Sequence, residues 1–582
     1  MRHPPVNAPG LTCAVFPLSL DTAAPRPPGR DLWLLTLLCA VLFGLGLGSP
    51  PLPNPDESRY AEIPREMLAA DDWVTPRLNG VNYFEKPPLV YWLVAASEKV
   101  FGLNEWAVRA VPALFALGGV LLTYGATRRL YGRNAGFAAG VILATSLLFF
   151  ALARILLLDM VVSVLMSAAL FCFVLAVQEP AGSRRRWLFY AVYASMALAT
   201  LTKGLIGFLV TGAVMFLWLL ICNQWHRLRP LYLPTGALLF LALAAPWHVL
   251  AALHNPTWAH RYFVFEHWER FTSNAAGRSG PWWYFVPILL VGLFPWTGFL
   301  WGVIRTALRG GWSARKENAA AWFCVIWAAF IFLFFSLSHS KLPPYILPVF
   351  PPLAALLGAW LARVLETERS WLRGSIGVFA GFCGLLGAAI LVVVFVKSSV
   401  LRDPARALAL RPFALALAAI IMTGGGLTWW LERRQGARAA LSALILTTVA
   451  FYATLTQAVP IIQRAGTREF ALIVKARAQP ADRVVHYHEF FHDFAFYAER
   501  TVDVVGNGGV DPFGELELDE DAAARASGRF MDDASFRRHW AGPQRLWVVA
   551  EKETVQGLFA DPSFRYYLLG ETRWHYLFSN QP

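Results

Sequence analysis

Charged side chains interrupt several otherwise apolar stretches of this 582-residue chain. Asp159 directly follows three leucines, and Lys203 lies between Leu201 and Leu205. A charged group at membrane depth is costly and faces a bundle interior or a cavity, so it is a candidate functional residue. One shared polar cavity would explain both residues and the other polar candidates: Asp56, Glu57, Arg59, Tyr60, Tyr83, Glu85, Lys86, Arg154, His267, Arg270, Lys341 and Tyr345.

The residue types in this group indicate what such a cavity would bind. Ammonium and guanidinium groups form charge-assisted hydrogen bonds to phosphate oxygens. The carboxylates of Asp56, Glu85 and Asp159 suit a cation, a hydroxyl or an amine. Because the group carries both signs of charge, it predicts a zwitterionic or two-part reactant.

The acidic candidates of the first long loop also have a structural interpretation. Asp56 and Glu57 follow a proline and could cap a helix that starts near Arg59. Glu85 and Lys86 could form an interfacial ion pair, which contributes little to stability when it is solvated. Both interpretations stay open at the level of the sequence.

Three candidates near predicted helix ends could be structural as well. Lys203 could extend its ammonium to the interface, with Asp159 as its structural partner. Lys341 lies close to a helix end and could extend in the same way.

Two groups of residues are candidate metal ligands. Glu85 or Glu266 with His267 could hold a divalent ion such as zinc, but a single histidine at an interface is more often not a ligand. We therefore expect no required cofactor. The second group comprises His486, His488, His492 and Asp493, and the alternation of a strand accounts for its first two histidines.

The composition indicates that lipid is the solvent of most of the chain. Its residues are 57% hydrophobic and only 15% charged, and the mean hydropathy is +0.46. Runs long enough to cross a hydrocarbon core about 30 Å thick predict about thirteen transmembrane helices, give or take one. They lie near 32–48, 107–126, 135–152, 156–177, 187–201, 204–222, 235–253, 284–304, 319–336, 344–362, 375–396, 412–431 and 440–458. A β-barrel is excluded, because its strands are short and alternate.

The net charge of +13 is explained by topology rather than by nucleic-acid binding. Arginines gather in alternate loops, for example at 128–133, 184–186, 227–229 and 433–438, which is the positive-inside pattern. An odd number of spans with a cytoplasmic N-terminus places the C-terminus outside. The candidate site residues then share the outer face.

The remaining segments define three further regions. Residues 1–31 are rich in proline and alanine, which is typical of a disordered cytoplasmic tail. The loop 49–106 between the first two spans of the transmembrane domain, 32–458, contains two stretches with the pattern of surface-lying amphipathic helices, 59–69 and 87–100. Residues 459–582 have the composition of an α/β domain, with strands expected at 483–488, 501–505 and 546–550.

Several motifs resemble one known family. The stretch PDESRYAEIPREM at 55–67 and the stretch WVTPRLNGVNYFEKPPLVYW at 73–92 resemble the first external loop of the bacterial aminoarabinose transferases of the ArnT type. Further similarities are TKG at 202–204, FEHWERF at 265–271 and SKLPPYIL at 340–347. The resemblance implies a polytopic α-helical GT-C fold, related to protein O-mannosyltransferases, with a C-terminal periplasmic α/β domain.

The resemblance also implies an activity. The protein would move 4-amino-4-deoxy-L-arabinose from undecaprenyl phosphate to a lipid A phosphate at the periplasmic face of the bacterial inner membrane, which confers resistance to polymyxin and other cationic peptides. Asp56 matches the family's catalytic carboxylate. Lys86, Arg270 and Tyr345 would bind the donor phosphate, and Glu85 would line the cavity. We expect a monomer that works among membrane lipids without nucleic acid.

The residues refine this expectation. A phosphomonoester is already largely ionised at neutral pH, so Asp56 need not act as a base. It can instead contact the sugar or acceptor, or stabilise positive charge at the anomeric carbon, with Glu85 and Asp159 as further catalytic candidates. We expect direct displacement with inversion.

Two alternatives remain. A related transferase could move another sugar from a polyprenyl phosphate to lipid A or to protein. A lipid flippase or transporter belongs to a different class, and the missing internal repeat argues against it.

Overall fold

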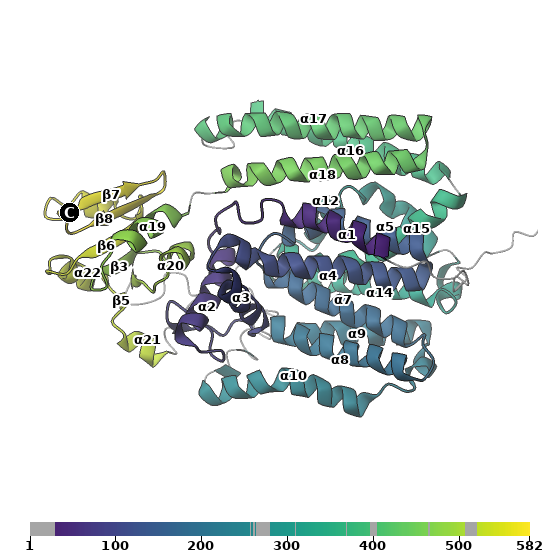
Figure 1. Ribbon diagram of the computed structural model, residues 1–582, viewed down its shortest axis with the longest axis horizontal. Helices are drawn as coiled ribbons and strands as arrows, with labels where there is room; N and C mark the ends of the chain where they lie inside the picture. The colour runs from purple at the N-terminus through teal and green to yellow at the C-terminus, as the bar shows by residue number, and fades with distance from the viewer. Residues whose placement is uncertain are drawn as a thin grey trace, which may run out of the picture.

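The computed structural model describes residues 29–255, 258–259, 262, 280–308, 310–367, 369–395, 404–463, 466–506 and 521–582. These residues form a long helical bundle and a smaller α/β domain at one end of it (Figure 1). The predicted tail 1–31 lies almost entirely outside the described residues, because α1 begins at Gly29.

Helices fill the bundle, and every predicted span falls on helical structure. Among the described residues, eight helices are long and apolar enough to cross a membrane, or nine if a bent pair counts as one span. The bundle contains α1 (Gly29–Cys39), the π-helical turn η1 (Ala40–Gly44), α4 (Glu105–Tyr131), α5 (Arg133–Thr145), α6 (Leu147–Leu152), α7 (Leu158–Ala176), α8 (Ser183–Lys203), α9 (Ile206–Cys222), η2 (Trp225–Leu228), α10 (Leu233–His254), α12 (Phe285–Gly292), η4 (Thr297–Phe299), α13 (Leu300–Ala307), η5 (Gly311–Arg315), α14 (Ala319–Leu337), η6 (Pro343–Val349), α15 (Phe350–Thr367), α16 (Arg369–Phe395), α17 (Pro404–Arg434) and α18 (Ala437–Ile462).

Two predicted spans are not continuous helices. The span 284–304 bends by 101° between Phe285–Gly292 and Thr297–Ile304, and Pro295, which has no N–H group to donate within a helix, lies at the bend. The span 135–152 breaks at Ser146, whose backbone is extended. Hydropathy detects both spans but not their breaks.

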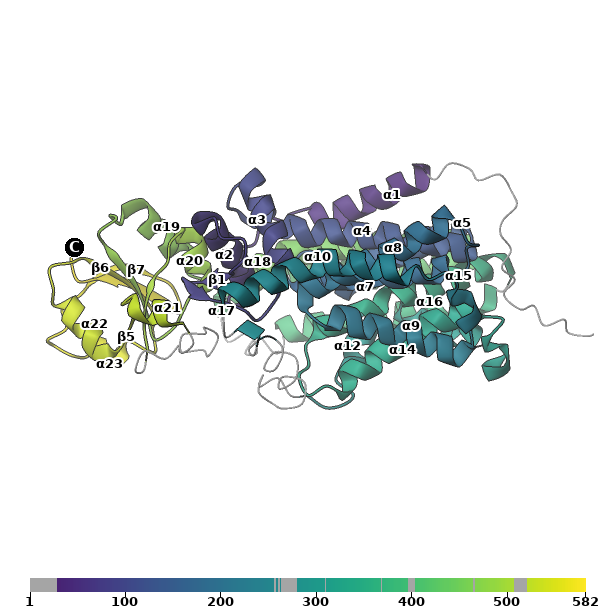
Figure 2. The same cartoon turned by 90° about the horizontal axis from the view of Figure 1, so that it is seen from below.

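The arginine-rich loops meet at one end of the bundle. Arg133 at the start of α5 pairs with Asp31 of α1 at 2.6 Å, and Arg185 donates to the carbonyl of Arg227 at 2.5 Å. Arg315 donates to the carbonyl of Ile221 at 2.9 Å. The α/β domain lies at the opposite, arginine-poor end, as Figures 1 and 2 show. The alternation of loops predicted this separation.

The first long loop forms a folded layer between the bundle and the α/β domain (Figure 2). It contains α2 (Asp56–Ala70), the hairpin of β1 (Arg77–Leu78) with β2 (Val81–Asn82), and α3 (Leu89–Phe101). The two helices predicted in this loop are present, and α2 is buried by protein from Glu57 to Met67, where it packs against α3 and against α20 of the α/β domain. By contrast, α3 exposes Val100 and Phe101 at its end.

The α/β domain is built on a six-stranded sheet with the order β5-β4-β3-β6-β8-β7. The strands β3 (Arg483–Tyr487), β4 (Asp503–Val505), β5 (Phe530–Met531) and β6 (Leu546–Glu551) are parallel, whereas β7 (Tyr567–Glu571) and β8 (His575–Ser579) pair antiparallel. The domain's helices are α19 (Arg468–Arg477), α20 (His492–Ala498), α21 (Ala522–Ala526), α22 (Asp533–Trp540) and α23 (Gln556–Phe559). In register, Val485 lies opposite Asp503 on one side and Val548 on the other.

Candidate functional site

Asp56 is the first residue of α2, at the arginine-poor end of the bundle. Its side chain is 49% exposed, and one Oδ atom lies 2.6 Å from a terminal nitrogen of Arg59, which is 4% exposed. The residue before the helix is Pro55, and no side chain caps it. The interpretation of Asp56 as a helix cap is therefore wrong. Its half-exposed carboxylate can contact a bound reactant.

Arg59 also lies against two buried tyrosines. Its guanidinium carbon is 5.3 Å from the ring centre of Tyr60 and 6.0 Å from that of Tyr83. Burial raises the pKa of Tyr60; Arg59 lowers it, and the charges of Glu85, Asp56 and Asp159 raise it further. Burial likewise raises the pKa of Tyr83 well above its usual value. Both phenols therefore keep their protons and can donate hydrogen bonds.

Glu85 and Lys86 connect the β1–β2 hairpin to α3. The Lys86 ammonium donates to the carbonyl of Glu85 at 2.7 Å and lies 4.0 Å from the Glu85 carboxylate. Their side chains are only 15% and 17% exposed, so the two residues are not a solvated surface pair. The neighbouring Phe84 is anchored in an apolar cluster with Leu201 and Trp247, which holds this turn against α8 and α10.

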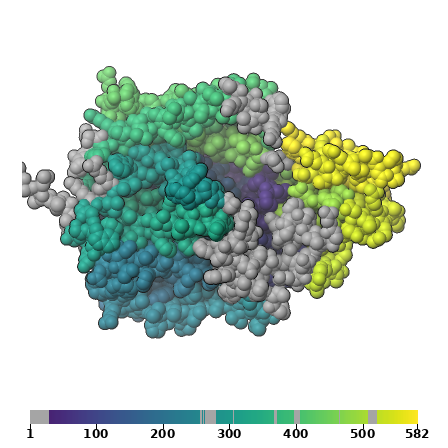
Figure 3. All heavy atoms as spheres, turned by 180° about the vertical axis from the view of Figure 1, so that it is seen from behind, coloured from purple at the N-terminus to yellow at the C-terminus, as the bar shows by residue number. Residues whose placement is uncertain are grey.

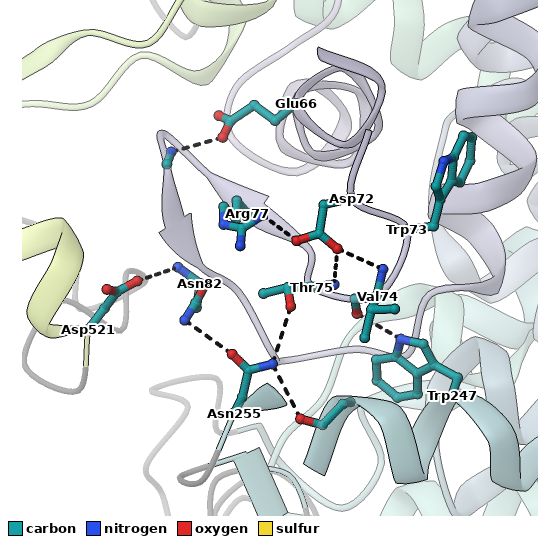
Figure 4. A network of polar contacts seen from close by, with 12 residues as sticks. Glu66, Asp72, Trp73, Val74, Thr75, Arg77, Asn82, Trp247, Asn255 and Asp521 are labelled. Carbon is teal, nitrogen blue, oxygen red and sulfur yellow. Dashed lines mark hydrogen bonds and ion pairs between the residues drawn. The ribbon is translucent and has the colours of Figure 1, made fainter. Parts of the chain in front are cut away.

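A polar network fixes the loop that carries these residues (Figure 4). Asn255 at the end of α10 donates to Thr75 Oγ1 at 3.2 Å and accepts from the Asn82 amide at 3.4 Å. The backbone N–H of Asn82 in turn donates to Asp521 of the α/β domain at 3.1 Å. The loop is thus attached to both parts of the molecule.

Asp159, Lys203 and Tyr345 meet although they come from three elements. The Lys203 ammonium, at the end of α8, lies 2.6 Å from Asp159 in the first turn of α7. The same ammonium lies 4.7 Å from the ring centre of Tyr345 in η6. The structural partnership predicted for Asp159 and Lys203 is present, and the charge of Asp159 is among those that raise the pKa of Tyr60.

Two other predicted candidates form hydrogen bonds within the chain. Arg154 donates to the carbonyls of Leu42, Phe43 and Leu45, so it caps the end of the first span. Lys341 is buried, and its ammonium donates to the carbonyl of Ser338 at 2.5 Å.

Glu57 has a partner that the sequence did not reveal. Both of its carboxylate oxygens accept from Arg109 of α4 at 2.8 Å, and Glu57 also accepts from the backbone N–H of Leu156 at 2.9 Å. Arg109 further donates to the carbonyls of Leu47, Pro50 and Pro51. In the sequence, Arg109 is detectable as a charged residue inside an apolar run. Its neighbours along the chain do not indicate that it pairs with Glu57.

Arg270, His267 and Glu266 lie outside the described residues. The predicted phosphate contact of Arg270 and the predicted metal pair of Glu85 with His267 therefore stay predictions. Within the described ranges, no group of three His, Cys, Asp or Glu residues is arranged to hold a metal ion. In the α/β domain, His488 pairs with Asp533 at 3.1 Å, and Nδ1 of His486 accepts from the N–H of Phe491.

The surface is recessed where the bundle meets the α/β domain, and the N-terminal part of the chain lies at the bottom of this hollow (Figure 3). The family described as dolichyl-phosphate-mannose-protein mannosyltransferase matches residues 85–249. The undecaprenyl phosphate-alpha-4-amino-4-deoxy-L-arabinose arabinosyl transferase of Aeromonas salmonicida is 34% identical over 427 residues, which cover 71% of this chain and 74% of that protein. The chain belongs to this arabinosyl transferase family.

The solved structure of an ArnT protein supports the membership over almost the whole length. ArnT from Cupriavidus metallidurans bound to undecaprenyl phosphate superposes with a TM-score of 0.82 at 30% identity, covering 95% of this chain and 98% of that one. The arabinosyl transferase of Pectobacterium atrosepticum is 33% identical, and its alignment spans 64% of that relative's length. ArnT membership confirms the predicted GT-C fold, and this chain is a multi-pass membrane protein.

Proposed function

We propose that this chain transfers 4-amino-4-deoxy-L-arabinose from undecaprenyl phosphate to a phosphate of lipid A. The observation that carries the proposal is that three pairs, Asp56 with Arg59, Glu85 with Lys86, and Lys203 with Tyr345, lie at the arginine-poor end of the bundle, where the charges of Asp56, Glu85 and Asp159 all act on Tyr60. By the positive-inside rule this end faces the periplasm, and the α/β domain lies there too.

The cations and phenols of this group suit the donor's phosphate. Lys86, together with Arg270 and Tyr345, would bind it, because ammonium and guanidinium groups form short charge-assisted bonds to phosphate oxygens. As the bond between the anomeric carbon and the donor phosphate breaks, negative charge grows on the departing undecaprenyl phosphate. These groups would stabilise that charge.

Asp56 would act on the acceptor or on the sugar rather than on the departing phosphate. The attacking oxygen belongs to a phosphate whose second pKa is about 6, so it is already ionised and needs no general base. The half-exposed Asp56 carboxylate can orient the acceptor or stabilise positive charge at the anomeric carbon. Attack from the face opposite the leaving phosphate forms the new carbon–oxygen bond with inversion. A divalent ion at Glu85 and His267 is a further proposal.

The product explains a biological role. The transferred sugar carries an amine, so the modified lipid A has less net negative charge and attracts polymyxin and other cationic peptides less strongly. The enzyme would act as a monomer in the inner membrane of a bacterium.

The test is complementation in a polymyxin-sensitive strain that lacks its own transferase. Wild-type protein should produce an aminopentose adduct on lipid A in mass spectra and raise resistance, and Asp56→Asn should produce neither at equal protein level. A hexose-sized adduct instead would support the alternative suggested by the mannosyltransferase match. Folded wild-type protein without any adduct would refute the proposal.

A further inference from the structure

The segment that leads into Asp56 is held by the α/β domain. The side chain of Asn54, two residues before Asp56, donates to a carboxylate oxygen of Asp493 at the start of α20. In return, the backbone N–H of Asp493 donates to Asn54 Oδ1 at 2.9 Å. Ser58 Oγ donates to the same oxygen at 2.8 Å, so Asn54 joins the first turn of α2 to the domain.

Asp493 is itself rigidly placed inside its own domain. It is 1% exposed, and its carboxylate accepts from the backbone N–H of Thr467 at 2.6 Å and from the Thr467 hydroxyl at 2.8 Å. A Cβ atom at Gly466 would lie 2.3 Å from Asp493 Oδ2, so the chain needs glycine at that position. Charge-assisted bonds of this kind are stronger than neutral ones, which makes Asp493 a firm anchor.

A second contact holds the same segment slightly upstream. The backbone N–H of Leu52 donates to the Tyr497 hydroxyl at 2.9 Å, and that hydroxyl donates to Glu105 at 2.9 Å. Tyr497 lies on the same helix as Asp493. Residues 52–54 are therefore attached at two points to α20, while Glu57, one residue after Asp56, is attached to Arg109 of the bundle.

We propose that Asp493 is a positioning residue for the transfer reaction: through Asn54 it fixes the start of α2 and thereby the place of the Asp56 carboxylate. The inference rests on the function proposed above. Asp56 is half exposed and pairs with Arg59 of its own helix, so the position of its carboxylate depends on the backbone around it. The α/β domain thus takes part in building the candidate active site.

Side-chain exchange tests this inference in the full-length protein reconstituted with donor and lipid A. Asn54→Asp places two carboxylates together, and Asp493→Asn, with its oxygen still accepting from the N–H of Thr467, places an amide N–H against that of Asn54. Each should lower kcat by about 10- to 100-fold, the range expected when a reacting group is displaced by about 1 Å, with little change in KM for the donor. The double exchange, Asn54→Asp with Asp493→Asn, restores the complementary pair and should recover kcat to within a few-fold of wild type.

Asp503→Asn is the matched control. Asp503 is a buried carboxylate of the same domain, but it pairs with Arg483 inside the domain and does not contact the Asp56 segment. The inference is overturned if both single variants transfer sugar as fast as Asp503→Asn, or if the folded double exchange stays as slow as the single variants. If Asp493→Asn does not fold, Asn54→Ala breaks the connection from the other side and must show the same loss of kcat. A wild-type protein without transferase activity would instead refute the proposed function.

Discussion

Tyr83 is a buried residue whose hydroxyl has no evident structural role. Its side chain is fully buried, yet its hydroxyl has no hydrogen-bond partner among the described residues. A buried polar group without a partner costs free energy, so its presence requires an explanation. The neighbouring Arg59 and the high pKa of the phenol favour a hydroxyl that donates to a bound reactant.

Tyr83→Phe should therefore keep stability and lose activity. Because the hydroxyl makes no internal bond, the thermal midpoint should not fall, whereas the transfer rate should drop about 10-fold through loss of one substrate hydrogen bond. The control is Tyr452→Phe, since the Tyr452 hydroxyl donates to the carbonyls of Thr145 and Phe294 inside the bundle. That change should cost about 1 kcal/mol of stability and leave the rate unchanged. Full activity in Tyr83→Phe would remove Tyr83 from the site.

The pair of Asp159 and Lys203 can be tested in the same way. Asp159→Asn leaves a largely buried ammonium without its partner and should destabilise the protein by about 3 kcal/mol. The double variant Asp159→Asn with Lys203→Met removes both charges and should regain most of the stability, measured as the thermal midpoint in detergent. It should still transfer sugar poorly if the pair borders the reactants. A stable and active double variant would show that the pair is only structural.

At the scale of elements, α2 is the connection between the two parts of the molecule. It begins with Asp56, packs against α20 on one side, and is held to α4 by Glu57 and Arg109. Both side chains of that pair are at most 3% exposed. A fully buried pair is costly to break because the remaining charge stays uncompensated.

Glu57→Gln should loosen α2 from the bundle. The change replaces the carboxylate by a neutral amide and leaves the buried charge of Arg109 uncompensated, so the expected loss is about 3 kcal/mol, read as a lower thermal midpoint and faster proteolysis of the first long loop. For comparison, Lys475→Gln breaks a pair that is 45% and 40% exposed and should cost at most about 1 kcal/mol. Equal effects of the two changes would contradict the role assigned to Glu57.

At the scale of the whole molecule, the α/β domain and the bundle depend on each other. The domain supplies Asp493 and Asp521 to the first long loop, and this loop carries Asp56, Tyr83 and Lys86 of the candidate site. A change in the packing of the α/β domain should therefore alter the position of the candidate site residues. His486 is a convenient place to alter this packing with pH, because it is fully buried among Phe490, Phe491 and Phe494.

Burial, with a smaller effect of His492, lowers the pKa of His486 from 6.5 to about 3. Between these values the unfolded chain binds a proton that the folded chain does not, so this contribution to stability is complete above pH 6.5 and is lost as the pH falls. At pH 5 the loss should be about 2 kcal/mol. The thermal midpoint of wild type should fall more between pH 7.5 and pH 5 than that of His486→Gln. Parallel curves for the two proteins would contradict this prediction.

The sequence predicted much of this molecule from local properties. A run of apolar residues long enough for the bilayer is visible in any window, and the loop arginines assign each end of the bundle. The strands β3, β4 and β6 were recognisable, since buried parallel strands are continuous apolar runs. The two-residue strand β5 and the largely exposed strand β7 were missed, because they show no buried face with a clear period. The buried strand β8 was missed as well.

The sequence by itself determined that most of the chain lies in lipid and which end of the bundle is rich in arginine. It also determined the group of residue types that can bind a phosphate and an amine. Only the tertiary structure decided which of these residues meet. Glu57 pairs with Arg109, Lys203 with Asp159, and Asn54 with Asp493, across 52, 44 and 439 positions of the chain. Hydropathy and periodicity describe neighbouring residues, whereas such pairs form because packing brings distant elements together and a buried charge requires a partner.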